Sequence, residues 1–310
     1  MQESEGSGQS ADRHGGDTPE SRATGVASLL AGALVWGVIW YPYRFLRDNG
    51  VDGVMASTLT YAVAFLLGAF LFRRVLRSWK CARRDRMRLL VLAISAGGCN
   101  LGYVLATLHG EVVRVLLLFY LAPLWTVLLS RMILGERLNR IGTLVIGLSL
   151  ASAATVLWQP AAGWPLPRDV ADWLGLGAGF SFALFNVYSR HARDVPVELK
   201  SMVAFSGVVL VGAGVMAFAP ASLPVSSVGI WGLLALLGLV LVIINVVVQY
   251  GLSNLPANRA IVIMLTEVGI AALSAWWLAG ESFGSREALG GAMIIAASVF
   301  SAKMEPEENN

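Results

Sequence analysis

The sequence predicts an all-α membrane protein of ten transmembrane helices, arranged as two inverted five-helix repeats. Three observations lead to this fold class. Of the 310 residues 56% are hydrophobic and 14% charged, and the mean hydropathy is +0.67, which is far more apolar than a soluble domain. Uncharged stretches of about 20 residues, the length that crosses the hydrocarbon core, recur along the chain. The chain also resembles itself at an offset of 145 residues, from Asn100 to Asn245.

The expected helices follow from these uncharged stretches. The clearest case is the segment from Ser201 to Asn258, which carries no charged residue and is interrupted only by the turn-like "APASLP". The expected spans are 24–43, 53–72, 89–108, 114–134, 140–158, 172–190, 200–218, 229–251, 258–279 and 286–303.

Domain boundaries follow from these spans. The polar first 23 residues lack the apolar core of a signal peptide, so we expect a disordered cytoplasmic tail. We expect the remaining units to be a first five-helix repeat at 24–158, a periplasmic linker at 159–171, a second inverted repeat at 172–303 and a cytoplasmic C-terminal tail at 304–310.

The distribution of basic residues predicts the orientation. If both termini are cytoplasmic, 18 of the 23 Lys and Arg residues fall in inside segments, as the positive-inside rule requires. The loop after the second helix alone carries eight of them, from Arg73 to Arg88. We interpret this cluster as a topology signal and not as a nucleic-acid site.

The internal repeat aligns polar positions of the two halves. An offset of 145 places Arg114 on Arg259 and Glu136 on Glu281, and "AGALVWGVIWYPYRF" aligns with "GAGFSFALFNVYSRH" at an offset of 146. Because each half has five helices, an odd number, the second half must enter the membrane in the opposite direction. Such inverted repeats are typical of secondary transporters.

Two segments carry a resemblance to a known family. "YLAPLWTVLLSRMILGERLNRIGTLVIGL" and "NLPANRAIVIMLTEVGIAALSAWWLAGE" resemble the paired signature of the drug/metabolite transporter superfamily, the EamA-type ten-helix exporters. The segment "GEVVRVLLLFYLAPLW" also resembles the aromatic amino acid exporters within it. The resemblance implies a multi-pass protein of the bacterial inner membrane that exports amino acids.

This chain departs from the family pattern at one pair of residues. The second-half signature usually reads Glu-Pro, where this chain has Glu267 and Val268, whereas the first half keeps Pro123. Since proline cannot donate its backbone hydrogen bond, we expect a kink in the fourth helix and none in the ninth.

Glu267 is the leading candidate for a substrate-binding residue. A charged carboxylate at mid-bilayer costs on the order of 2.5 to 3.5 kcal/mol on insertion scales, so such residues usually face a cavity or a partner. Arg259 lies about 12 Å away along a straight helix, too far to pair with it. The alternatives are a site for a substrate ammonium group or a proton, and a protonated carboxyl that bonds a neighbouring helix.

Two repeat-related helix faces carry further polar candidates. Asn100 shares a face with Tyr103, and Asn245 shares one with Gln249, since the spacings are three and four residues. Such faces can hydrogen-bond a zwitterionic ligand, but polar side chains also commonly join membrane helices to one another.

Aromatic side chains complete the set of candidates. Trp36, Trp40 and Tyr43 share one helix face and, with Tyr120, could stack on an aromatic substrate. An interfacial aromatic belt is the alternative, and Trp36 is the residue of the first helix that departs from it.

The remaining charged motifs have structural interpretations. Glu111 and Arg114 are three residues apart and could pair with each other at the surface. The repeated Gly-Glu pairs, at Glu136 and Glu281, are expected to end a helix and to organise a turn with a nearby arginine such as Arg286.

The sequence lacks the motifs of several function classes. It contains no P-loop, no GxGxxG after a strand, no HExxH and no GxSxG with triad partners, so we expect neither an enzyme nor direct ATP-driven transport. Two cysteines and scattered histidines predict no disulfide, no metal site and no cofactor.

The functional hypothesis is a secondary transporter that exports amino acids, most of all aromatic or bulky apolar ones, by alternating access. Its partners would be this small-molecule substrate, protons and the lipid bilayer. Two alternatives stay open: an exporter of lipophilic cations or other small metabolites, and a membrane protein that transports nothing.

Overall fold

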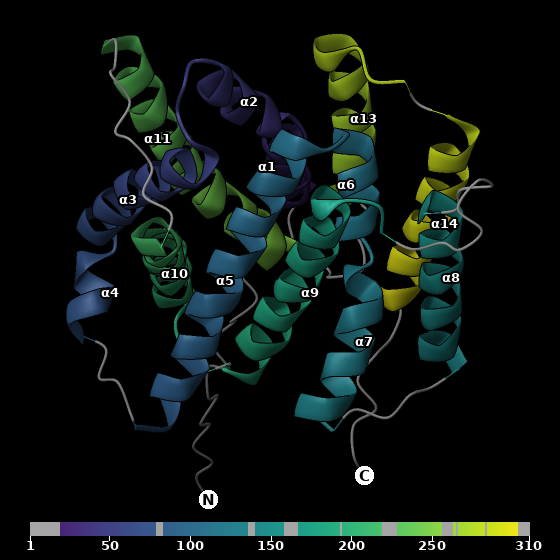
Figure 1. Ribbon diagram of the computed structural model, residues 1–310. Coiled ribbons are helices and arrows are strands. Elements are labelled where there is room, and N and C mark those ends of the chain that lie inside the picture. Colours follow the sequence, from purple (N-terminus) through teal and green to yellow (C-terminus); the bar gives the residue numbers. More distant parts are fainter. Residues whose placement is uncertain are drawn as a thin grey trace, which may run out of the picture.

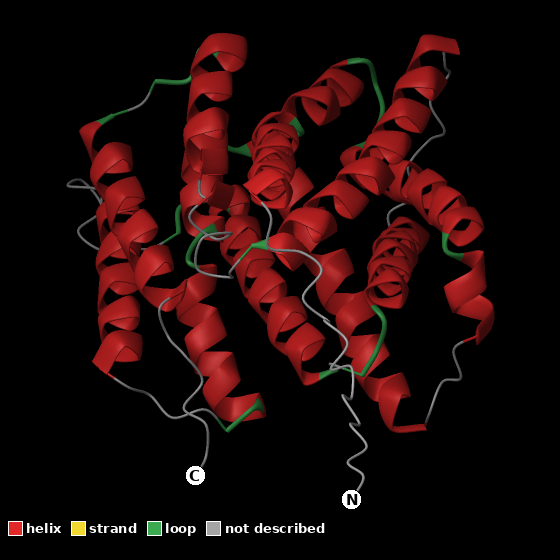
Figure 2. Ribbon diagram, turned by 180° about the vertical axis from the view of Figure 1, so that it is seen from behind, coloured by secondary structure: helices red, strands yellow, loops and turns green. Residues whose placement is uncertain are grey.

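The structure is a computed structural model that describes residues 19–78, 83–135, 140–157, 167–192, 194–218, 228–255, 263–264, 266–282 and 284–302. These residues form helices and connecting loops without a strand (Figure 2). Most of the expected N-terminal tail, most of the expected linker, the expected C-terminal tail, Glu136 and Arg259 lie outside them. Residues 19–23, which we expected to belong to the disordered tail, form the start of a helix.

The first half of the chain contains the helices up to residue 157. They are α1 (Pro19–Val38), α2 (Trp40–Asp48), α3 (Gly53–Leu71), α4 (Arg73–Ser78), α5 (Arg83–His109), α6 (Val112–Phe119), α7 (Ala122–Ile133) and α8 (Arg140–Leu157). The second half contains α9 (Val170–His191), α10 (Val197–Phe218), α11 (Val228–Asn254), α13 (Thr266–Ala279) and α14 (Ser285–Ala302).

Hydropathy and length identify membrane-spanning helices among these elements. Within the described residues, seven segments are long and apolar enough to cross a bilayer: Ala23–Asp48, Gly53–Leu71, Asp85–His109, Val112–Ile133, Val170–His191, Val197–Phe218 and Val228–Leu252. The protein is therefore an all-helical membrane protein, as the composition predicts. The count of ten spans and the inversion of the halves stay predictions.

Helices of the two halves pack against each other throughout the molecule. α5 contacts α9 and α10, α1 contacts α11 and α13, and α3 contacts α10 and α11. α8 and α14 lie side by side at one edge, whereas α3 and α4 lie at the opposite edge (Figure 1). α5, α6, α9 and α13 lie between these two edges.

Glycine permits the closest helix crossings. A Cβ atom on Gly207 of α10 would overlap the backbone carbonyl of Ala93 in α5, and one on Gly212 would overlap Thr58 of α3. Small residues allow such close approach of backbones, which is how membrane helices gain packing energy without a hydrophobic driving force between them.

Two of the expected spans are broken by a short irregularity. The first span divides into α1 and α2 at Ile39, three residues before Pro42, and the fourth divides into α6 and α7 at Tyr120 and Leu121, just before Pro123. At the second break the Leu121 amide donates to the Leu118 carbonyl, 3.2 Å away, so the backbone tightens to an i→i−3 bond. An irregularity was expected at Pro123, and the one at Ile39 was not. The expected ninth span lies partly outside the described residues, so its straightness stays a prediction.

Candidate functional site

The centre of the candidate site is a hydrogen bond between the two halves. The Tyr120 hydroxyl donates to Oε2 of Glu267 over 2.8 Å. Tyr120 lies at the break between α6 and α7, and Glu267 lies in the first turn of α13 as the structure describes it. The interrupted helix therefore presents a side chain to the carboxylate that the sequence places in the middle of a membrane segment.

Glu267 lies close to polar side chains of α5 and is partly exposed. Its carboxylate lies within electrostatic range of Cys99 and Tyr103 of α5, and its side chain is still partly exposed. An ionisable residue at such depth is costly unless it faces a partner or a hydrated cavity. The Tyr120 hydroxyl supplies such a partner.

Aromatic rings form a cluster next to this pair. Phe119 is its centre: its ring centroid lies 5.5 Å from that of Tyr103, 5.6 Å from that of Tyr120 and 5.3 Å from that of Phe182. The first two contacts are edge-to-face, the arrangement that the ring quadrupoles favour. The cluster brings together α5, α6 and α9, and thus both halves, around the carboxylate.

The asparagines of the two halves make equivalent contacts. Asn100 accepts from the hydroxyl of Ser57 and donates to the hydroxyl of Tyr61 over 2.9 Å. In the second half, the hydroxyl of Ser201 donates to Asn245 over 2.9 Å. Both asparagines therefore bond the preceding long helix, which is the helix-joining role that the sequence left open for them.

The structure does not bring all the predicted site residues together. Trp40 is buried, and its indole N–H donates to the Ser274 hydroxyl of α13 over 3.0 Å. Tyr43 is buried in a different apolar cluster, against which Trp36 packs. Trp36 and Tyr43 thus lie at one apolar cluster and Trp40 at another, so the structure does not bring the three rings together at one site.

The two remaining predicted candidates are Tyr103 of α5 and Gln249 of α11. Tyr103 joins the group around Glu267, three residues along α5 from Asn100. Gln249 lies partly buried on α11, four residues after Asn245. The structure thus assembles Tyr103, Tyr120 and Glu267 at one place.

A second link between the halves lies beyond the end of α13. Oε1 of Glu281 is 3.0 Å from Nη1 of Arg44, and Oε2 accepts from the backbone amides of Val112 and Val113 at 2.8 and 3.4 Å. Both charged side chains are largely buried, at 18% and 12% exposure. Glu281 thus caps α6 in trans, where anions are favoured by the free amides of a helix start.

Two predicted pairings are corrected by these contacts. Glu281 pairs with Arg44 of α2, where the sequence led us to expect a nearby arginine such as Arg286. Arg114 pairs with Asp172 of α9, Nε to Oδ1 at 2.7 Å and Nη2 to Oδ2 at 2.8 Å, where we expected Glu111. In both cases a partner far along the sequence offers a more buried site than the local one.

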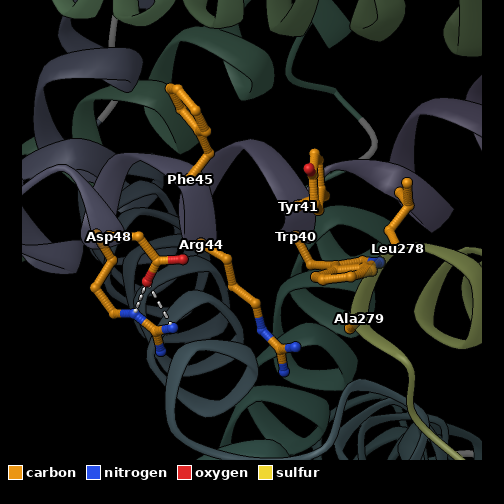
Figure 3. Close-up of a pocket in the computed structure, with 8 residues that line it drawn as sticks. Trp40, Tyr41, Arg44, Phe45, Asp48, Leu278 and Ala279 are labelled. Carbon is orange, nitrogen blue, oxygen red and sulfur yellow. Dashed lines mark hydrogen bonds and ion pairs between the residues drawn. The ribbon is translucent and has the colours of Figure 1, made fainter.

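A cavity of about 260 Å³ lies between α2 and the end of α13. Trp40, Tyr41 and Arg44 line it from α2, opposite Leu278 and Ala279 (Figure 3). The Arg44 guanidinium lies 4.8 Å from the centre of the Trp40 ring and also donates to the carbonyls of Thr107 and Gly110. Since these contacts already engage the Arg44 guanidinium, the cavity is a lesser candidate for binding than the surroundings of Glu267.

Metal binding has no support among the described residues, because no group of three or more His, Cys, Asp or Glu side chains comes together there.

Comparison with known proteins decides the family. A model of the EamA-like transporter family matches residues 23–158 and matches again over residues 170–302. The chain belongs to the EamA-like transporter family. The two matched segments correspond closely to the two predicted repeats.

Relatives of this EamA-like protein are named as transporters or as RarD. An uncharacterized transporter of Archaeoglobus fulgidus is 29% identical over 274 residues, which cover 88% of this chain and 94% of the relative. Protein RarD of Salmonella typhimurium is 25% identical over 66% of this chain and 67% of its own length. The uncharacterized transporter YojE of Bacillus subtilis is 24% identical over 88% and 91%.

A solved structure shares the fold of this EamA-like protein. It covers 90% of this chain and 96% of its own, with a TM-score of 0.57 and 18% sequence identity. At this identity the likeness concerns the fold alone.

Proposed function

We propose that this EamA-like protein exports amino acids, most of all aromatic or bulky apolar ones, by alternating access of two inverted five-helix halves. The observation that carries the proposal is the contact between Tyr120 and Glu267 beside an aromatic cluster. The carboxylate suits a substrate ammonium group, and the neighbouring rings suit an apolar side chain.

Equivalent contacts in the two halves support the alternating-access part. Ser57 and Asn100 of α3 and α5 have counterparts in Ser201 and Asn245 of α10 and α11. The pairing of α5 with α9 likewise has a counterpart in that of α11 with α1. Internal equivalence of this kind lets one half exchange conformation with the other around a fixed central site.

The proposed setting is the bacterial inner membrane, with both termini in the cytoplasm. The excess of Lys and Arg in the expected inside loops supports this orientation. In that orientation, the Arg44–Glu281 pair lies toward the outer surface and would close the path there.

Uptake into proteoliposomes tests the substrate class. Vesicles that contain the purified protein should take up labelled Phe or Trp faster than empty vesicles. Protein molecules that insert inside-out export their substrate into the vesicle, so export is measured as uptake. Uptake equal to that of empty vesicles, in several buffers, would rule out the amino acid assignment.

An exporter of lipophilic cations is the second candidate, favoured by the same observation. A carboxylate among aromatic rings also binds an organic cation, by charge and by cation–π attraction. Competition separates the two: a lipophilic cation that blocks Phe uptake at low concentration and is itself accumulated would favour the cation exporter.

A further inference from the structure

Phe182 of α9 occupies an unexpected position on its helix. At 100° per residue it falls in the middle of the face formed by Gly175, Ala178, Gly179 and Ala183, all of which are buried. Yet Phe182 is 39% exposed. The ring of Phe182 is therefore accessible at a position where its neighbours on the same face are packed against other helices.

The contacts of Phe182 show which residues surround its ring. α9 packs against α5, α6 and α7, and the Phe182 ring lies 5.3 Å from that of Phe119 at a tilt of 45°. Phe119 in turn contacts Tyr120, the partner of Glu267. Phe182 is thus the residue of the aromatic cluster that comes from the second half of the chain.

Phe180, two residues earlier, provides a contrast. It is 38% exposed, nearly the same as Phe182, but it lies on the face of α9 with the exposed Trp173 and Gly177. Its ring contacts Trp125 of α7 at 5.5 Å. The two phenylalanines therefore share a helix and an exposed fraction but face different surroundings.

We propose that Phe182 selects the side chain of the substrate: its ring, with that of Phe119, forms the wall against which an aromatic side chain stacks while Glu267 receives the ammonium group. This assignment rests on the proposed amino acid transport. Stacking geometry favours aromatic rings over branched aliphatic chains of similar area, because ring pairs gain energy beyond the area that they bury.

The test compares Phe182→Leu with Phe180→Leu in proteoliposomes, with initial uptake of Phe, Trp and Leu measured for each. We expect the ratio of Phe to Leu uptake to fall on the order of 2- to 10-fold in Phe182→Leu, the range that one aromatic pair contributes. Phe180→Leu should keep the wild-type ratio. A general structural defect would lower both rates and leave their ratio unchanged.

A third variant tests the wall by its size. Phe182→Trp fills part of the space, so uptake of Trp should fall relative to uptake of Phe. Thermal unfolding in detergent checks that each variant is folded.

The possible outcomes separate this assignment from the function on which it rests. If wild-type protein moves neither Phe nor Leu, the amino acid proposal and the role of Phe182 both fail. If wild-type protein moves Phe but the ratios of Phe182→Leu and Phe180→Leu are the same, only the role of Phe182 is overturned.

Discussion

At the scale of single residues, the side chains around Glu267 have separable tasks. Tyr120 donates to one carboxylate oxygen from the opposite half, and the rings of Tyr103 and Phe119 pack against each other beside this pair. A carboxylate held in this way can carry either a proton or a substrate cation, because both neutralise a charge that the membrane interior disfavours.

Replacing Glu267 by Gln tests proton coupling. The amide has nearly the same shape and can still accept from Tyr120, but it cannot bind a proton. We expect Phe transport by Glu267→Gln to lose its dependence on a pH gradient, measured as uptake with and without an imposed gradient. Pronounced gradient dependence that persists in the variant would contradict proton transfer at this residue.

The matched control is Tyr120→Phe, which removes the hydroxyl and leaves the carboxylate. It should weaken transport but keep a response to the gradient, because the group that binds the proton is still present. The loss of one hydrogen bond with a charged partner costs about 1.5 to 3 kcal/mol.

At the scale of elements, both ends of α6 form hydrogen bonds with residues in or just beyond α13. Glu281, just beyond the end of α13, caps the first amides of α6, and Glu267, near its start, bonds Tyr120 just after the last residue of α6. Tyr120 and Leu121 separate this short helix from α7. α6 also packs against α9, so its contacts join the first half to two helices of the second half.

Neutralising Glu281 should loosen this connection. Glu281→Gln removes the ion pair with Arg44 and weakens the cap, and breaking a buried ion pair costs up to about 3 to 5 kcal/mol. Partial exposure brings the expected loss below that range. We expect a clearly lower unfolding temperature in detergent.

The control for this prediction is the exposed pair of Arg47 and Asp48, with side chains 41% and 63% exposed. Asp48→Asn should change the unfolding temperature little, since exposed pairs contribute about 0 to 1 kcal/mol. Equal effects of the two variants would show that Glu281 contributes nothing beyond surface charge.

At the scale of the whole molecule, the crossing of α3 and α10 is the place where equivalent positions of the two halves meet. Tyr61 and Phe205 pack ring to ring there, with centroids 6.0 Å apart, and the tight contact of Gly212 with Thr58 has a counterpart in that of Gly68 with Met202. A pivot between two similar halves would be expected to have this arrangement.

Filling this crossing should destabilise the protein in a way that can be reversed. Gly212→Ala places a methyl group against the Thr58 side chain, and overpacking of this kind costs about 1 to 3 kcal/mol. Thr58→Ala in the same chain should recover part of the unfolding temperature. Gly207→Ala is the control: its new methyl group would meet the backbone of Ala93, so no side-chain substitution can restore its unfolding temperature.

The sequence predicted the helices and part of the site for definite physical reasons. Hydropathy predicts membrane spans because a helix needs about 20 apolar residues to cross the hydrocarbon core. Pro123 predicts an irregular helix because proline has no backbone N–H to donate. The contacts of Tyr120 with Glu267 and of Arg44 with Glu281 were not predictable, since each joins residues far apart along the chain. Phe182 stands out in the sequence as the large residue among Gly175, Ala178, Gly179 and Ala183.

The hydrogen bond from Tyr120 does not neutralise the charge of Glu267, and the carboxylate keeps lone pairs for further donors. A proton and a substrate ammonium group would then compete for the same negative charge, and the site would hold only one of them at a time. Such mutual exclusion makes the release of one a condition for loading the other. A carrier built on it would work as an obligatory exchanger, moving an amino acid out for each proton that enters.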